Sequence, residues 1–108
     1  MSITDPAILK AMFGHMREAT LQGLVMTALR EAGWVAYHTH DSRRSDPGFP
    51  DVVAIRRGRI IYRELKKIGG RLSPEQIVWR DALLDAGADY AIWNPYDWGS
   101  GSIIKEIE

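Results

Sequence analysis

The sequence predicts a single α/β domain, residues 1–108, in which helices flank a mixed sheet of about four strands. Three observations predict this class. Apolar residues recur at helical spacing in the first third of the chain, short apolar runs bounded by Gly and Pro follow, and a strong helix-start motif separates the third run from the fourth. The resulting order, α-β-β-β-α-β, is typical of one sheet covered by helices.

The first third of the chain predicts two helices, or one kinked helix, that end before Gly33. Asp5 followed by Pro6 is typical of a helix start, with an acidic N-cap and proline at the first helical position. The apolar spacing changes phase near Gly14 and His15, and Gly33 suits the position just after a helix end. The first phase contains Ile8, Leu9, Met12, Phe13 and Met16, and the second contains Leu21, Leu24, Val25, Ala28 and Leu29.

The strands predicted from the apolar runs cover residues 34–38, 51–55, 59–65 and 90–93. A polar loop at 41–48 separates the first two strands, and Arg57-Gly58 is the expected hairpin turn between the second and third. Asn94-Pro95 ends the fourth strand, and residues 103–107 are expected to form a short helix.

A further helix is predicted between the third and fourth strands. Ser73 suits its N-cap, Pro74 its first helical position, and Gln76 the position that closes a capping box. Apolar residues such as Ile77 and Leu83 extend the helix to Gly87.

Basic residues are concentrated in the middle of a chain that has no net charge. Residues 41–72 contain nine Lys or Arg and four Asp or Glu, so the remainder of the chain is correspondingly acidic. A local basic surface can bind phosphate, although ordinary solvent-exposed arginines explain this charge equally well. The chain has no Cys, which excludes disulfides and thiolate metal sites and suits a cytoplasmic protein.

Two short motifs place polar groups where two strands are expected to meet. Gly48-Phe49-Pro50-Asp51 sets an acid at the start of one strand, and Glu64-Leu65-Lys66 ends the next. Residues two apart in a strand share a face, so Glu64 and Lys66 project together, and a hairpin would bring Asp51 opposite them. Two carboxylates with the Leu65 carbonyl form an all-oxygen site that suits Mg²⁺ or Mn²⁺. A lysine beside such a site can orient or help deprotonate water.

Each motif alone has a simpler interpretation. An acid after proline is usually a turn or cap residue, and a Glu-x-Lys pair on a strand is usually a solvated ion pair. The joint spacing of the acids at 51 and 64 with the lysine at 66 is more specific than either motif. His38 and His40 lie two apart, but without Cys or another nearby His they do not predict a zinc site.

With these motifs the sequence closely resembles the VRR-NUC domain of the PD-(D/E)xK superfamily. The resemblance rests on GFPD at 48–51, ELK at 64–66, and LSPEQ at 72–76 with Trp79, and it covers residues 18–98. Flanking matches are Gly33-Trp34, Asp41 to Ser45, Trp93-Asn94-Pro95 and Asp97-Trp98. Residues 1–16 precede the family's usual start and form an extra N-terminal helical segment. The resemblance implies a PD-(D/E)xK nuclease-like fold, and the compact form is similar to stand-alone phage and prophage members, which act in the cytoplasm of a bacterial host.

The resemblance also implies a role for each site residue. Asp51, Glu64 and the Leu65 carbonyl would be metal ligands, and Lys66 would handle the attacking water. Glu18 matches the family's acid on the first helix and would join the metal site by holding a water, while Gln76 would support the site or contact phosphate. A second cation, Lys67, makes the Lys66 assignment less exclusive. The residues expected to contact DNA are Arg43, Arg44, Lys67 and His38.

A metal-dependent DNA endonuclease using Mg²⁺ or Mn²⁺ is the implied function. Branched DNA, above all a four-way junction, is the expected substrate, because stand-alone members resemble junction resolvases; a flap or nicking nuclease is the alternative. A DNA-binding module with a decayed site and a structural phage protein are rivals, which the intact set of site residues disfavours. A homodimer is expected because a two-fold pair of sites matches two strands. Its interface is the apolar stripe of residues 8–16, unless that stripe packs on its own core.

Overall fold

The computed structural model describes residues 2–40 and 46–108. The helices there are α1 (Pro6–Phe13), α2 (Glu18–Glu31), α3 (Pro74–Asp85), α4 (Pro95–Gly99) and α5 (Ser102–Ile107). The strands are β1 (Val35–His38), β2 (Val52–Arg56), β3 (Arg59–Leu65) and β4 (Asp89–Trp93). The predicted α/β class and the predicted order of elements are confirmed, with α4 as an addition.

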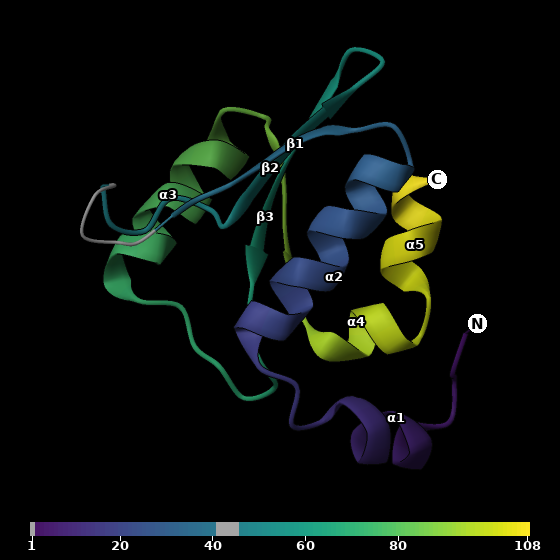
Figure 1. The fold of residues 1–108 in the computed structure, drawn as a ribbon. Coiled ribbons are helices and arrows are strands. Elements are labelled where there is room, and N and C mark those ends of the chain that lie inside the picture. Colours follow the sequence, from purple (N-terminus) through teal and green to yellow (C-terminus); the bar gives the residue numbers. More distant parts are fainter. Residues whose placement is uncertain (1, 41–45) are drawn as a thin grey trace.

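One mixed sheet organises the molecule. Its strand order is β1-β2-β3-β4; β1 pairs antiparallel with β2, and β2 with β3, whereas β3 and β4 are parallel. Figure 1 shows α3 on one side of the sheet and α2 with α5 on the other. The helix α3 therefore connects the two parallel strands, as a parallel pair requires.

The core lies between the sheet and the α2–α5 layer. Its fully buried side chains are Leu21, Val25, Met26 and Leu29 of α2, Trp34, Val52, Ala54, Ile61, Leu65, Trp93, and Ile103 with Ile107 of α5. By contrast, α3 buries no residue completely. The sheet face on the α3 side keeps exposed apolar side chains at Val35, Tyr37, Ile55, Ile60 and Ile92. Every helix in the described part of the chain is too short or too polar to cross a bilayer.

The predicted helix boundaries rest on local chemistry, and most are confirmed. The Asp5 carboxylate accepts hydrogen bonds from the Ala7 and Ile8 N–H groups, and Ser73 and Gln76 form the capping box that begins α3. Gly33 follows α2 with φ 87°, a conformation that glycine adopts without steric cost. Arg57 and Gly58 both have positive φ, 50° and 77°, as a two-residue hairpin turn requires.

The structure decides between two alternatives and refines the end of one helix. The first third forms two separate helices, the first of the two alternatives that the sequence predicted, with the break at residues 14–17, and α3 ends at Asp85, before Gly87. Asn94-Pro95 ends β4 as expected, but Asn94 also caps α4, with Asp97 closing a second capping box. Trp98 lies in α4 and is half-buried against the core.

The apolar stripe of α1 is divided between two environments. A Cβ added at Gly99 would lie 2.4 Å from the Phe13 ring and 2.9 Å from Leu9, so α1 packs on α4 through these two side chains. Ile8 and Met12 stay 48% and 58% exposed. Leu9, Phe13 and Met16 of the stripe therefore pack on their own chain, whereas Ile8 and Met12 remain exposed.

Candidate active site

The residues predicted from the two motifs meet at one end of the sheet. Asp51 stands just before β2, Glu64 is the penultimate residue of β3, and Lys66 follows that strand. Glu18 is the first residue of α2, and Gln76 lies in the first turn of α3. Strand and helix ends that are far apart in the sequence thus supply one cluster of polar side chains, joined by hydrogen bonds and an ion pair.

Asp51 is held by backbone groups of the neighbouring strands. The Leu65 N–H donates to the Asp51 Oδ2 at 2.7 Å, which ties the carboxylate to the end of β3. Thr39 fixes the other side, because its N–H donates to the Asp51 carbonyl at 2.8 Å and its hydroxyl to the Pro50 carbonyl at 2.7 Å. No sequence signal pointed to this role for Thr39, which lies beyond the predicted first strand.

Glu64 is a buried carboxylate that is only partly satisfied. It is 1% exposed. Its Oε2 accepts a hydrogen bond from the Gln76 side-chain amide at 2.8 Å and lies 3.5 Å from the Lys66 Nζ. Its Oε1 is buried and has no hydrogen-bond partner among the described residues. A buried acceptor without a partner is costly, and here it is oriented beside a second carboxylate.

The electrostatics of the pair favour uptake of positive charge. Burial raises the pKa of Glu64 to about 8, with the nearby Asp51 charge acting in the same direction and Lys66 opposing it. Burial also raises the pKa of Asp51. Two carboxylates in one poorly solvated place cannot both ionise at low cost unless a proton or a cation accompanies them. The all-oxygen donor set and the unpartnered Oε1 fit a hard divalent cation.

Glu18 lies at the margin of this cluster. Its Oε2 accepts a hydrogen bond from the Lys67 backbone N–H at 3.3 Å, and its charge is close enough to raise the pKa of Asp51. Within residues 2–40 and 46–108, no three His, Asp or Glu side chains converge closely enough to hold an ion by themselves. The geometry therefore agrees with a water-holding role for Glu18 better than with direct ligation.

The two sequence motifs that flank the site pack against one another. Gly48 has φ 92°, and a Cβ there would lie 2.4 Å from the Glu75 backbone and 2.8 Å from the Gln76 nitrogen. Next to it, the half-buried Phe49 ring meets Trp79 edge to face, with centroids 5.0 Å apart. The loop before Asp51 is thereby seated on the first turns of α3, which fixes Asp51 relative to Gln76. Sequence reasoning recognised both motifs but not their contact.

The expected DNA-contacting residues are distributed unevenly. Lys67 is exposed beside the site, and the His38 Nδ1 is hydrogen-bonded to the Gln22 amide at 3.2 Å, so His38 is oriented by α2. Its ring also packs near His40, at a centroid distance of 4.6 Å. Arg43 and Arg44 lie outside the described residues.

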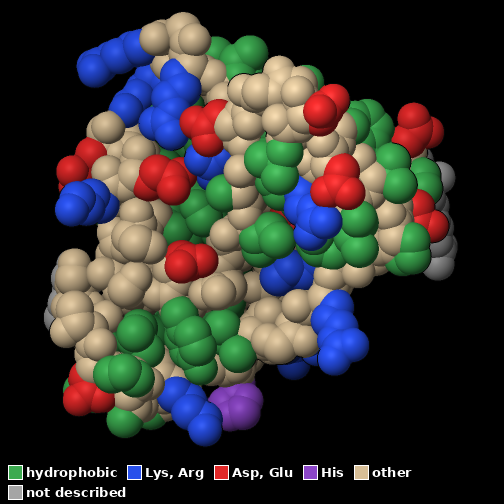
Figure 2. All heavy atoms as spheres, turned by 180° about the vertical axis from the view of Figure 1, so that it is seen from behind, with side chains coloured by type: hydrophobic (Ala, Val, Ile, Leu, Met, Phe, Trp, Pro, Cys, Tyr) green, Lys and Arg blue, Asp and Glu red, His purple; other side chains and the backbone are tan. Residues whose placement is uncertain are grey.

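The basic segment of the sequence is split between two ends of the sheet, which charge counting did not anticipate. Arg63 is buried and bonds to Asp89 and Glu106. Arg59 pairs with Asp89, and Arg56 donates to the Ala32 and Glu108 carbonyls. Figure 2 shows Lys and Arg side chains gathered around the β2–β3 hairpin, at the upper left. Arg56 and Arg59 serve the fold near the hairpin, and Arg63, although it directly precedes Glu64, faces the α5 side of the sheet, where it bonds to Glu106.

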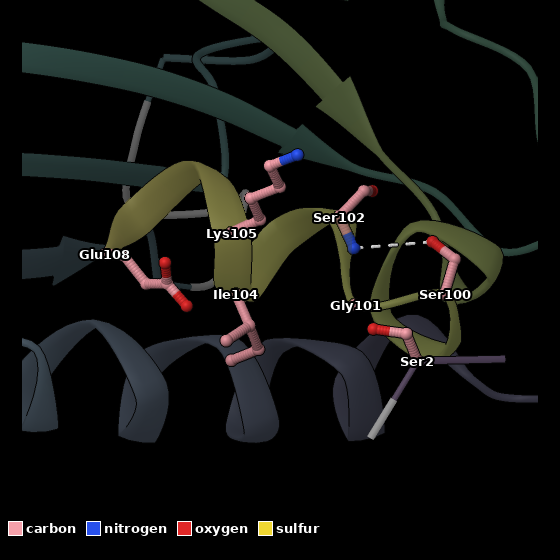
Figure 3. Close-up of a pocket in the computed structure, with 7 residues that line it drawn as sticks. All are labelled: Ser2, Ser100, Gly101, Ser102, Ile104, Lys105 and Glu108. Atoms are coloured by element: carbon pink, nitrogen blue, oxygen red, sulfur yellow. Dashed lines mark hydrogen bonds between the residues drawn. The ribbon is translucent and has the colours of Figure 1, made fainter.

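A pocket of about 690 Å³ lies apart from the carboxylates, between the N-terminal arm and α5. Figure 3 shows its lining, which includes Ser2, Ser100, Ser102, Lys105 and Glu108. The Ser100 hydroxyl oxygen already accepts a hydrogen bond from the Ser102 N–H at 3.4 Å. The pocket contains no paired carboxylates and no buried charge, so the chemistry is concentrated at the Asp51–Glu64 end.

Comparison with known proteins shows the family and the fold. The VRR-NUC domain family matches residues 10–94 of the chain. A solved structure described as a VRR_NUC domain superposes with a TM-score of 0.65 at 20% sequence identity, covering 83% of this chain and 91% of the other. That likeness concerns the fold. A search of curated proteins found no match.

Proposed function

The chain belongs to the VRR-NUC domain family of nucleases, and on that basis we propose that it is a Mg²⁺- or Mn²⁺-dependent DNA endonuclease selective for branched DNA. The observation that carries the metal dependence is the buried, unpartnered Oε1 of Glu64 beside Asp51. A protein that kept this fold only for binding would have no reason to retain two adjacent carboxylates that destabilise it. The intact cluster therefore argues against the decayed DNA-binding module.

Each residue of the cluster has a distinct task in this proposal. Asp51, Glu64 and the Leu65 carbonyl hold the cation, and Gln76 keeps Glu64 in place through its 2.8 Å hydrogen bond. When bound, Mg²⁺ or Mn²⁺ supplies the positive charge that stabilises the transferring phosphate and acidifies water. Lys66 orients the attacking water and moves its proton, and Glu18 holds a water at the margin of the site.

A four-way junction is the proposed substrate, with a flap or nicked duplex as the alternative. One domain of this size has a single cluster of catalytic groups, whereas a junction is resolved by two symmetric cuts. A homodimer supplies the second site through two-fold symmetry. Ile8 and Met12, exposed on α1, remain the proposed interface. Arg43, Arg44, Lys67 and His38 are proposed to contact DNA, and the protein is proposed to act in the cytoplasm of a phage-infected or lysogenic bacterium.

A substrate panel tests the activity. Linear duplex, flap and four-way junction DNA are incubated with Mg²⁺, with Mn²⁺ and with EDTA, and products are resolved on denaturing gels. We expect cleavage only with a metal, and most rapid cleavage of the junction. Equal rates on all three substrates would refute the selectivity, and the absence of cleavage with either metal would refute the enzyme.

The dimer is tested separately by sedimentation at micromolar concentration in cleavage buffer. We expect a dimer for the unmodified protein and dissociation for Ile8→Glu combined with Met12→Glu. Thr4→Glu, an exposed change near the start of the same segment, is the control. A monomer under cleavage conditions would exclude paired cutting, and a double variant that stays dimeric would move the interface elsewhere, for instance to the exposed sheet face.

A further inference from the structure

A basic pocket of about 280 Å³ lies beside the candidate active site. It lies between the α1–α2 linker and the chain that follows β3, and its lining residues are Gly14, His15, Met16, Arg17, Lys67 and Ile68. Figure 2 shows a histidine and basic side chains along the lower edge of the molecule, where this linker lies. The pocket thus combines hydrogen-bond donors from two segments that are about fifty positions apart in the sequence.

The basic side chains of this pocket do not take part in ion pairs that hold the described fold together. His15, Arg17 and Lys67 are all exposed, and none of them forms an ion pair with another described residue. Arg59 and Arg63 of β3 differ from these side chains, because both form ion pairs with Asp89. Exposed cations without internal partners, gathered around a cavity, are available for an external anion.

Two residues of the pocket are chain neighbours of residues in the catalytic cluster. Arg17 directly precedes Glu18, and Lys67 directly follows Lys66. The Lys67 N–H donates to the Glu18 carboxylate at 3.3 Å, so the two segments are joined where the pocket meets the site. An anion in the pocket would therefore be a near neighbour of the group that the carboxylates and their cation act on.

The start of α2 adds to the positive character of the pocket. Arg17 occupies the N-cap, and its side chain makes no capping hydrogen bond, whereas Asp5, Ser73 and Asn94 cap their own helices. The first N–H groups of a helix carry partial positive charge that favours anions. The three side chains carry the argument, and the helix start acts in the same direction.

We propose that this pocket binds a backbone phosphate of the DNA strand being cut, next to the scissile phosphate. The inference rests on the proposed function and adds the residues that position the strand, Arg17 and Lys67 with His15 as a ring N–H donor. Contacts to phosphate fix the register of a protein on DNA without reading its sequence. Arg17 and Lys67 are accordingly positioning residues, and their loss raises KM with little change in kcat.

The first test measures binding without cleavage. The affinity of the full chain for a short duplex is measured by fluorescence anisotropy in EDTA at several salt concentrations. The slope of log K against log salt is negative. Arg17→Ala combined with Lys67→Ala should reduce its magnitude by up to roughly 0.9 for each phosphate that is no longer neutralised. Arg30→Ala, which removes an exposed cation from the opposite end of α2, should leave the slope unchanged. Equal slopes for the double variant and the unmodified protein would overturn the proposal.

The second test locates the phosphate. A neutral methylphosphonate is placed in turn at each position flanking the cut, and KM is measured with the unmodified protein and with the double variant. We expect one position at which the neutral group raises KM for the unmodified protein but not for the double variant. If no position shows this coupling, the pocket does not bind the cleaved strand.

Failure of this inference and failure of the proposed function are distinguishable. Junction cleavage by the unmodified protein with unaltered slopes in the double variant would leave the nuclease intact and remove the phosphate pocket. A flattened slope without any cleavage would retain the pocket and refute the enzyme. Thermal unfolding of each variant shows that it is folded, because all three substituted side chains are exposed.

Discussion

The pKa values of two acidic side chains in or beside the β3 strand, Asp89 and Glu64, are shifted in opposite directions. Near the hairpin, burial acts to raise the pKa of Asp89, but hydrogen bonds from Arg59 and Arg63 outweigh it and lower that pKa. At the other end, burial raises the pKa of Glu64 to about 8, the Asp51 charge adds to the shift, and Lys66 opposes it only in part. Arginines therefore satisfy the first carboxylate within the chain, whereas at the second the Glu64 Oε1 has no hydrogen-bond partner among the described residues.

The same contrast concerns Arg63 and Lys66, which lie three residues apart. The Arg63 guanidinium donates to the Asp89 carbonyl at 2.7 Å and to carboxylates at 2.8 and 2.9 Å, and it lies over the Trp93 ring. Lys66 has one ion pair, at 3.5 Å from Glu64. The guanidinium is fixed by many partners and stabilises the fold, whereas the ammonium, with a single ion-pair partner, keeps more freedom to reorient.

The largest effect should come from substitutions in the cluster of Asp51, Glu64 and Lys66. Lys66→Ala should lower the cleavage rate by roughly 100- to 10,000-fold, because proton transfer to a positioned side chain contributes about that much. Asp51→Asn should lower it at least as strongly, because it removes a charged ligand of the proposed cation. Both variants should stay folded and bind DNA in EDTA. Cleavage is followed on the preferred substrate under single-turnover conditions. Unaltered cleavage by Lys66→Ala would transfer the water-handling role to Lys67 or refute the mechanism.

Substitution of the buried, ion-paired Arg63 should lower the free energy of unfolding and leave the cleavage rate unchanged. Arg63→Met removes the charge-assisted hydrogen bonds to Asp89 and Glu106 and should cost about 2–3 kcal/mol in the free energy of unfolding. Urea unfolding measures the loss, and Arg57→Gly in the neighbouring turn is the control, since its positive φ suits glycine. The cleavage rate per folded molecule should not change. A large rate loss in Arg63→Met would show that the two ends are coupled.

The raised pKa of Glu64 predicts a pH dependence of the metal-free protein. Between about pH 4.5, its ordinary pKa, and pH 8, the unfolded chain loses a proton that the folded chain retains, so stability falls as pH rises. Glu64→Gln should flatten this fall and should abolish the rise in melting temperature caused by Mg²⁺. A pH profile of the unmodified protein that is already flat would contradict the assignment of the shift.

The smallest effects are expected at the start of α3, where Ser73→Ala and Gln76→Ala distinguish the capping of the helix from the positioning of Glu64. Ser73→Ala removes the helix cap and should cost about 1 kcal/mol, while the cleavage rate stays near that of the unmodified protein. Gln76→Ala loses both its capping bond and its 2.8 Å bond to Glu64, so it should also weaken metal affinity. Calorimetry with Mg²⁺ and denaturant unfolding give the two quantities. Equal metal affinity in both variants would restrict Gln76 to the helix.

Local rules along the chain explain how much of the fold could be predicted. The caps at Asp5 and Ser73 and the turn at Arg57-Gly58 involve residues at most three apart, so the sequence shows them directly. The period of two along a strand places Glu64 and Lys66 on one side. The same capping pattern is present at Asn94-Pro95, but a strand end explains those residues equally well, so the sequence did not predict α4.

The order of the strands and of α3 and the starts of α1 and α3 follow from the amino-acid sequence alone, because each depends on neighbours along the chain. Three other facts required the folded structure: which arginines are buried, which Glu64 oxygen lacks a partner, and how Gly48 and Phe49 seat the Asp51 loop on α3. These depend on contacts between residues far apart in sequence. Burial, which sets both the cost of an unpaired charge and the direction of a pKa, exists only once those contacts form.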